Sequence, residues 1–336
     1  MAIKLLIGGS PCTYWSILQT PGRREVTNQG LGWELFKNYL IAKEKFKPDF
    51  FLYENNMSAA KRIKDMVANE LGVGSDPNVR FTPINSSLVS AQNRSRFYVT
   101  NFGDIEQPAD RDISFQDIKD TDYEYLKQFK VNRTPSREKM WDNGKRKTTT
   151  LQSCANITHA KKSFTLTTKQ DRAPNAGLVE FEDFCRYLTT HELERLQTMP
   201  VGYTKVLTKN QAEKALGNGW TAEVIIHLLF HALRSVSRDT EIIVLSLSMT
   251  VLPLVDIVLR RWDLQISNIT LTRLINTLSS VPWTITPTLF SVGTLSVFVK
   301  MIGSHHNHAQ NGLMSFWEVV SKWKFDLSLS KPPVSS

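Results

Sequence analysis

The chain has 336 residues, enough to bury a substantial core in one large domain with an insertion or in two smaller domains. Its 41 Lys and Arg against 32 Asp and Glu give a formal net charge of +9. This favours a polyanionic partner, although excess lysine also occurs on ordinary solvated surfaces. The three cysteines lie far apart without a CxxC pair, which argues against a disulfide framework or a metal site and favours a reducing compartment.

The first predicted element is a buried strand over residues 3–7, directly after Met1 and without a signal peptide. The strand ends at Gly8 and Gly9, which lack a Cβ and therefore let the backbone approach a ligand closely. Pro11 fixes the next turn and so the direction of Cys12, at the strand end where α/β sheets present a nucleophile. The pattern is also compatible with a structural thiol, because a free cysteine is often a small buried hydrophobe.

The next predicted elements alternate between helix and strand. A loop over residues 19–32 is followed by a helix over 33–47, a strand over 50–53, a helix over 58–71, a strand over 80–87 and a further strand after residue 92. This alternation predicts an α/β fold with a doubly wound sheet. Glu54 follows the second strand, so we expect Glu54 and Cys12 to share one rim of the sheet, where such folds bind ligands. Alternatively, a lone glutamate at a strand end caps a helix or forms an ion pair.

Apolar periodicity fades between residues 104 and 177, where basic residues gather together with aromatic ones. The stretch includes Trp141, Lys145, Arg146 and Lys147. A basic surface with interleaved aromatic rings favours nucleic-acid binding by a separate, smaller module, whereas a charge run alone is typical of a solvated linker.

Helical regularity returns after this stretch. Thr189 and Glu192 have the spacing of a capping box and predict a helix over residues 189–199. Two further helices are predicted over residues 211–216 and 220–233, with Gly217-Asn218-Gly219 between them.

Beyond residue 235 the composition changes, and two apolar stretches, 242–259 and 285–303, approach the length of a membrane span. Pro253 and Asp256 interrupt the first stretch and Lys300 lies in the second, which argues against membrane insertion. The sequence predicts no role for this tail.

Five of these segments, taken in chain order over residues 1–234, resemble the motifs of the DNA (cytosine-5)-methyltransferases. They are Gly9-Ser10-Pro11-Cys12, Glu54-Asn55-Asn56 (with Asn56 where the family usually has valine), Gln92-Asn93-Arg94-Ser95-Arg96, the segment from Arg186 to Gln197, and Gly217-Asn218-Gly219-Trp220. The Gly-Gly-Ser-Pro-Cys run, Thr165-Leu166-Thr167-Thr168 and Trp220 are most similar to the animal de novo branch and its phage relatives.

The resemblance implies a class I methyltransferase (Rossmann-like) sheet with an inserted target-recognition module. Residues 1–103 would form the catalytic part, 104–177 the basic target-recognition region, 178–235 the motifs that return to the catalytic domain, and 236–336 the tail. It also implies a protein of the bacterial or phage-infected cytoplasm, as in restriction-modification, or of the nucleus in a eukaryote.

The residue types suit this chemistry. Cytosine C5 is a poor nucleophile, and a Cys12 thiolate that adds at C6 creates an enamine able to attack a methyl donor. A carboxyl group such as Glu54 can bond cytosine N3 and the exocyclic amine and protonate N3. The resemblance implies that Arg96 holds the base carbonyl and that Arg94 supports the site, and both positive charges would favour the thiolate.

The resemblance also implies S-adenosylmethionine as cofactor and double-stranded DNA, with the target base flipped out, as partner. The implied cofactor-binding residues are Pro11, Asn218, Gly219 and Trp220. The implied DNA-binding residues are Ser16, Arg23, Arg24, Gln92, Trp141, Lys145, Arg146 and Lys147.

One part of the family pattern is missing. A Phe-x-Gly-x-Gly loop and an acidic residue for the ribose normally precede the nucleophile strand, whereas here Met1 starts on that strand. We therefore expect most of the cofactor pocket and the central strands to be absent, leaving an open sheet edge at Ile3 and a poorly stable isolated chain.

Several explanations stay open. The chain is completed by a second subunit that supplies the missing strands, or it is a truncated reading frame, or it is a DNA-binding protein without activity. A plain nucleic-acid-binding module with a structural Cys12 is the alternative from another functional class.

Overall fold

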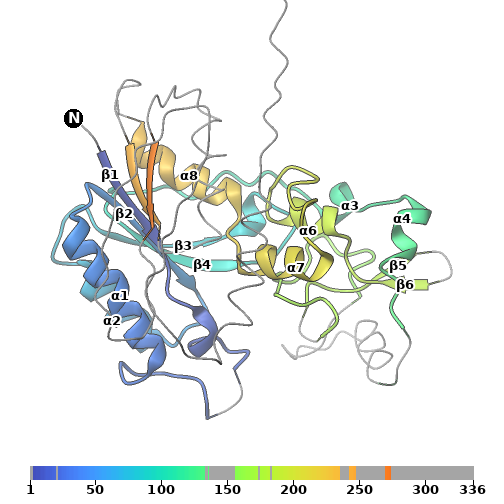
Figure 1. Ribbon diagram of the computed structural model, residues 1–336, viewed down its shortest axis with the longest axis horizontal. Coiled ribbons are helices and arrows are strands. Elements are labelled where there is room, and N and C mark those ends of the chain that lie inside the picture. The colour runs from blue at the N-terminus through green and yellow to red at the C-terminus, as the bar shows by residue number, and fades with distance from the viewer. Residues whose placement is uncertain are drawn as a thin grey trace, which may run out of the picture.

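The computed structural model describes residues 3–19, 22–132, 135, 156–172, 175–181, 184–234, 242–246 and 269–273. These residues form an α/β structure in which a six-stranded sheet with flanking helices lies beside a smaller body of short helices and a two-stranded sheet (Figure 1). The predicted α/β fold class is therefore confirmed. The predicted division of the chain near residues 103, 177 and 235 stays a prediction.

The large sheet has the strand order β3-β4-β2-β1-β7-β8. Strands β1 (Ile3–Gly8), β2 (Phe50–Asn56), β7 (Ile242–Ser246) and β8 (Ile269–Arg273) run parallel to one another. Strand β4 (Ser95–Thr100) is antiparallel to both of its neighbours, β2 and β3 (Arg80–Asn85). The carboxyl ends of β1 and β2 therefore meet the amino end of β4 at one edge of the sheet.

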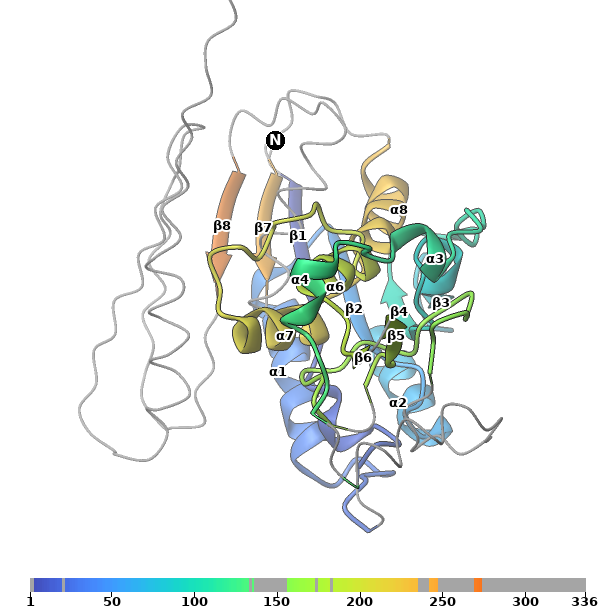
Figure 2. The same ribbon diagram turned by 90° about the vertical axis from the view of Figure 1, so that its right-hand side faces the viewer.

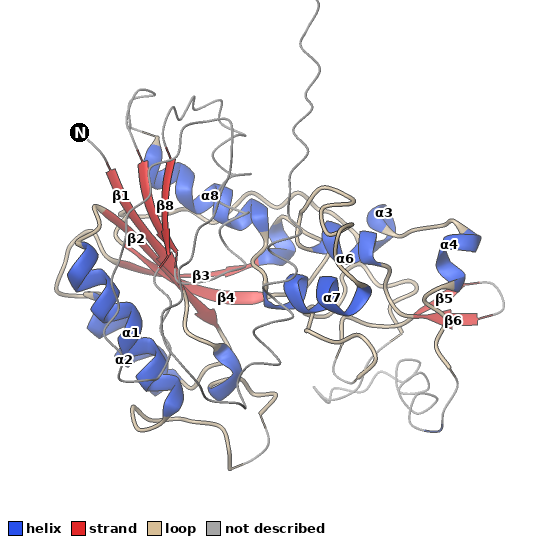
Figure 3. Cartoon of the chain, viewed as in Figure 1, coloured by secondary structure: helices blue, strands red, loops and turns tan. Residues whose placement is uncertain are grey.

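Helices cover both faces of this sheet (Figure 3). Helices α1 (Leu31–Phe46) and α2 (Lys61–Leu71) pack on the face that carries Leu6 and Phe51. Helix α8 (Ala222–Leu233) packs on the other face, against Leu5 and Ile7. Successive side chains of a strand point to opposite faces, so β1 needs apolar residues at consecutive positions.

The expectation that β1 forms an open edge is wrong. Strand β7 pairs with it in parallel from Ile3↔Ile242 to Ile7↔Ser246, and β8 pairs with β7 (Figure 2). Val244 is fully buried in the cluster around α8, and Leu245 is buried in the cluster around α1 and α2. The short apolar run 242–245 thus behaves as an interior strand, and the instability expected from an unpaired β1 has lost its basis.

The smaller body consists of α3 (Phe115–Ile118), α4 (Tyr123–Lys127), β5 (Val179–Phe181), β6 (Phe184–Arg186), α6 (Thr190–Leu196) and α7 (Lys209–Asn218). Thr189 and Glu192 form the predicted capping box of α6. Glu192 also forms a fully buried bidentate ion pair with Arg186, at 2.7 and 2.8 Å, which ties α6 to β6. Two single turns of 3-10 helix, η1 (Cys12–Tyr14) and η2 (Ser86–Leu88), complete the described elements.

No helix within the described ranges is long and apolar enough to cross a bilayer. Most of the two apolar stretches, 242–259 and 285–303, lies outside those ranges.

Candidate active site

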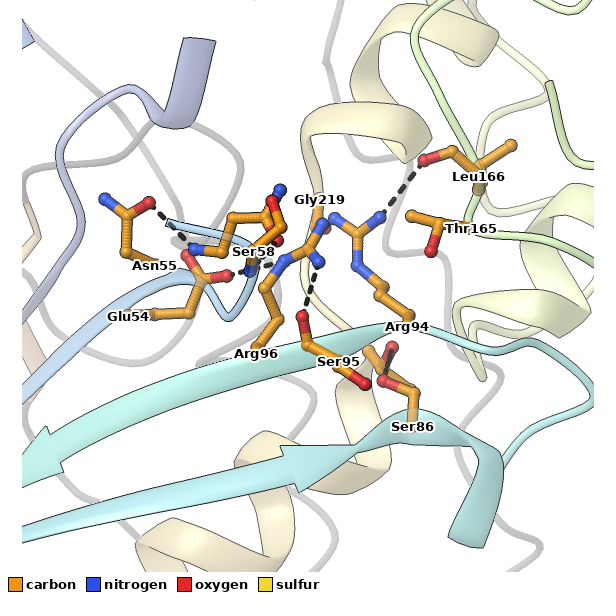
Figure 4. A network of polar contacts seen from close by, with 12 residues as sticks. Glu54, Asn55, Ser58, Ser86, Arg94, Ser95, Arg96, Thr165, Leu166 and Gly219 are labelled. Carbon is orange, nitrogen blue, oxygen red and sulfur yellow. Dashed lines mark hydrogen bonds and ion pairs between the residues drawn. The ribbon is translucent and has the colours of Figure 1, made fainter. Parts of the chain in front are cut away.

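The structure brings Cys12, Glu54 and Arg96 to one edge of the large sheet, as the sequence predicts. Cys12 begins the single turn after β1 and is exposed, Glu54 lies on β2, and Arg96 lies on β4. The Nε atom of Arg96 lies 3.0 Å from Oε1 of Glu54, and both side chains are largely buried (Figure 4). The edge thus combines an exposed cysteine residue with a charged pair that is largely shielded from water.

Gly9 lets β1 and β2 approach each other at this edge. A Cβ at Gly9 would lie 2.4 Å from the carbonyl oxygen of Glu54, which is too close for any residue other than glycine to fit without a shift of the backbone. The glycine therefore allows close contact between two backbone segments, whereas the sequence predicts that it allows close contact with a ligand.

Arg94 is buried behind the edge and binds backbone carbonyl groups. Its guanidinium donates to the carbonyl oxygens of Leu166 at 3.1 Å and Gly219 at 2.7 Å (Figure 4). Burial and the neighbouring Arg96 lower the pKa of Arg94 to about 9. These contacts fit the supporting role implied for Arg94, because they join β4 to two loops of the smaller body.

The net electrostatic effect on Cys12 differs from the expected one. Desolvation raises the pKa of the Cys12 thiol, and the nearby Glu54 carboxylate raises it further, while Arg96 and Arg94 lower it. Burial likewise raises the pKa of Glu54, against the opposing effect of Arg96. The two arginines therefore favour the thiolate as predicted, but desolvation outweighs them and the net effect is a raised pKa of the Cys12 thiol.

A buried polar network anchors the turn that carries Cys12. The Tyr53 hydroxyl lies 2.7 Å from Oγ of Ser10, and the Asn55 amide donates to the Ser10 carbonyl oxygen at 3.0 Å and to Oγ at 3.1 Å. In the sequence, Ser10 and Asn55 stand out only as parts of motifs, and Tyr53 is one residue of the predicted apolar strand over residues 50–53. The available signal was a hydroxyl in an otherwise apolar strand.

The residues predicted to bind the cofactor differ in accessibility. Pro11 and Asn218 are exposed, whereas Gly219 and Trp220 are buried. The Gly219 carbonyl oxygen already accepts hydrogen bonds from Arg94 and Gln197, and a Cβ on Gly217 would lie 2.4 Å from the backbone of Thr167. This segment therefore packs against protein, and the described residues do not by themselves form a cradle that fits the cofactor.

Several residues predicted to contact DNA are engaged within the protein. Gln92 is fully buried and donates to the Leu196 carbonyl oxygen at 2.6 Å, so its placement contradicts a DNA contact and gives it a structural role. Ser16 is buried and accepts a hydrogen bond from the Leu18 amide. Arg24 donates to the carbonyl oxygens of Trp15 and Ser58 and so fixes the loop after Cys12.

Arg23 is exposed on that loop, between Gly22 and Arg24, and stays a candidate for phosphate contact. Trp141, Lys145, Arg146 and Lys147 lie outside the described residues. Within the described ranges, no group of three or more His, Cys, Asp or Glu side chains could hold a metal ion.

Comparison with known proteins agrees with the motif pattern. The family model of C-5 cytosine-specific DNA methylase matches residues 1–232. Similar solved structures include the Dnmt2 methyltransferase of S. pombe, with 16% identity, a TM-score of 0.45, and coverage of 60% of this chain and 72% of that one. A search of the curated proteins finds no match.

Two other similar structures are the Entamoeba histolytica methyltransferase EhMeth and a putative DNA modification methyltransferase encoded within an E. coli prophage. EhMeth has 15% identity, a TM-score of 0.49, and coverage of 69% of this chain and 78% of that one. The prophage protein has 18% identity, a TM-score of 0.39, and coverage of 70% and 79%. Because the family model spans well over half of the sequence, the chain belongs to the C-5 cytosine-specific DNA methylase family.

Proposed function

We propose that this chain acts on cytosine in double-stranded DNA through a covalent bond between Sγ of Cys12 and C6 of a flipped base. The observation that carries the proposal is the exposed Cys12 beside the buried Glu54–Arg96 ion pair. A thiol and a desolvated carboxylate–guanidinium pair supply the nucleophile and the hydrogen-bonding groups that the pyrimidine ring requires. Flipping the base out of the duplex costs a few kcal/mol of stacking.

Each of the three side chains has one role. The Cys12 thiolate adds to C6, and the electron pair of the C5–C6 double bond moves toward C5 and the ring. Glu54 bonds N3 and the exocyclic amine. Burial raises the pKa of Glu54, which increases the fraction of the protonated form that can donate to N3. Arg96 holds the carbonyl oxygen of the base and keeps Glu54 in place.

S-adenosylmethionine, the methyl donor of the family, supplies an electrophilic methyl group for C5 when it is bound. The described residues do not fit a complete site for it, so the proposal for this chain's own residues ends at the covalent addition. Strands β7 and β8 of the same chain lie beside β1, so the proposal does not require a second subunit at that edge of the sheet.

Tritium release from DNA containing [5-³H]cytosine tests this proposal without a methyl donor. After the thiolate has added to C6, C5 takes a proton from water. Elimination then breaks the C6–Sγ bond as C5 loses a hydrogen nucleus, and tritium appears in the solvent while cytosine is restored. We expect release that requires both the protein and double-stranded DNA. DNA binding without release would instead support a nucleic-acid-binding module with a structural cysteine.

The pH dependence of this release follows from the pKa of Cys12. Desolvation raises that pKa, so the thiolate fraction and the rate are expected to keep rising with pH beyond about 8.5, the ordinary pKa of a thiol. Arg96→Gln removes the charge that most favours the thiolate, and its rate profile is expected to move to higher pH. Arg80→Gln is the control, because Arg80 pairs with Asp104 at the surface. A plateau below pH 8 would contradict the prediction.

A further inference from the structure

Tyr53 joins the nucleophile turn to the core of the sheet. Its ring is fully buried, with centroids 5.3 Å from Phe36 and 5.0 Å from Tyr39 on α1. Its hydroxyl leaves this apolar surrounding and reaches Oγ of Ser10, two residues before Cys12. The Asn55 amide donates to the same hydroxyl at 3.0 Å. The phenol therefore accepts from Asn55 and has its own proton available for Ser10.

A neighbouring tyrosine shows that this contact is specific. Tyr39 is almost equally buried in the same cluster, yet its hydroxyl has no hydrogen-bond partner among the described residues. A buried tyrosine in this core therefore does not need a hydrogen bond for its hydroxyl, as Tyr39 shows. The hydroxyl of Tyr53, in contrast, is bonded to both Ser10 and Asn55.

Three consecutive residues of β2 alternate between the two faces of the strand, with Tyr53 and Asn55 on one face and Glu54 on the other. Tyr53 and Asn55 hold Ser10, and Glu54 between them faces Arg96. The register Gly8↔Tyr53 and the tight contact of Gly9 with the Glu54 carbonyl oxygen keep the two chain segments side by side. The attachment of Ser10 to β2 thus holds the start of the turn that carries Cys12 beside the strand that carries Glu54.

We propose that Tyr53 is a positioning residue whose hydroxyl, through Ser10, holds the turn that carries Cys12 in register with Glu54. The proposal rests on the function proposed above and adds a residue to it. Tyr53 touches neither the base nor the thiol. Its loss leaves the charged groups around Cys12 in place but lets the turn move relative to the pyrimidine ring.

The test compares Tyr53→Phe with Tyr39→Phe, which removes the hydroxyl that makes no hydrogen bond. We expect Tyr53→Phe to lower the kcat of tritium release about tenfold, with the KM for DNA within about twofold of wild type. The pH profile is expected to keep its position, because the Cys12 pKa is shifted by desolvation and by the charges of Arg96, Glu54 and Arg94, and the Tyr53 hydroxyl is not among these causes. Tyr39→Phe is expected to match wild type.

Ser10→Ala supplies the second variant. Because Tyr53 acts through Ser10, the double variant Tyr53→Phe with Ser10→Ala is expected to lose no more activity than the more impaired single variant. Wild-type kcat in Tyr53→Phe, an equal loss in Tyr39→Phe, or a double variant whose loss is the product of the two single losses would each overturn the proposal.

Hydrogen exchange of the free protein separates this proposal from the proposed function. Faster exchange of the amides of Gly9, Ser10, Cys12 and Thr13 in Tyr53→Phe, but not in Tyr39→Phe, supports the positioning role even when the wild-type protein releases no tritium. Unchanged exchange in both variants overturns it. Tritium release by the wild-type protein is a separate test: its presence supports the proposed function and its absence contradicts that function, whatever the exchange experiment shows.

Discussion

Replacing Cys12 by serine is expected to reduce tritium release from [5-³H]cytosine DNA to background, a loss of at least about a thousandfold. Serine keeps the size of the side chain, but its hydroxyl has a far higher pKa than a thiol and does not provide the anion that adds to C6. Cys12 is an exposed residue after β1 and belongs to neither of the hydrophobic clusters that cover the large sheet, so the variant is expected to fold and to bind DNA as wild type does.

Cys185→Ser is the matched control for this experiment. Cys185 lies on β6 in the smaller body, away from the sheet edge that carries Glu54 and Arg96. Its replacement is expected to leave tritium release unchanged. Release retained in Cys12→Ser, with DNA binding intact, would show that the cysteine is structural and that the covalent mechanism is wrong.

Local patterns were enough to predict the elements that place the site. Continuous apolar runs identified β1 and β2, because strands covered on both faces need apolar residues at consecutive positions. Helix α2 and the capping box of α6 depend on residues a few positions apart. Since β1 and β2 are parallel neighbours, their carboxyl ends necessarily bring the segments of Cys12 and Glu54 to one edge.

Contacts between distant segments could not be predicted in the same way. The antiparallel insertion of β4 between β2 and β3 brings Arg96 to Glu54, and no local periodicity encodes that register. Gln92 looks like an available amide in its motif, yet α6 covers it in the fold. The net pKa shift of Cys12 depends on how much protein surrounds the thiol, which a list of neighbouring charges does not contain.

Strand β7 is the largest difference between the fold predicted from the sequence and the observed fold. Its residues, Ile242 to Ser246, form a short apolar run within a segment of changed composition, and five residues alone do not distinguish a strand from other apolar segments. Only its pairing with β1 identifies it as part of the sheet. The segment beyond α8 therefore contributes to the core beside β1, where the sequence predicts an open edge.

Val244→Asp is expected to show that β7 is required for the fold. Val244 is completely buried between β1 and α8, and an aspartate there would lose the apolar contacts of valine and place a carboxyl group among Leu5, Ile225 and Leu229. We expect the free energy of unfolding to fall by about 4 kcal/mol or more, which for a domain of ordinary stability removes a large part of the total. Urea denaturation followed by tryptophan fluorescence measures the change.

Val206→Asp is the matched control, since Val206 is 56% exposed and the same substitution there is expected to change the unfolding free energy by no more than about 0.5 kcal/mol. Equal stability of the two variants would mean that β7 does not pair with β1 in solution. The edge of β1 would then be free for a strand from a second subunit, and the purified chain would be expected to self-associate through it. A large loss in Val244→Asp alone would establish that the segment after α8 supplies an interior strand of the sheet.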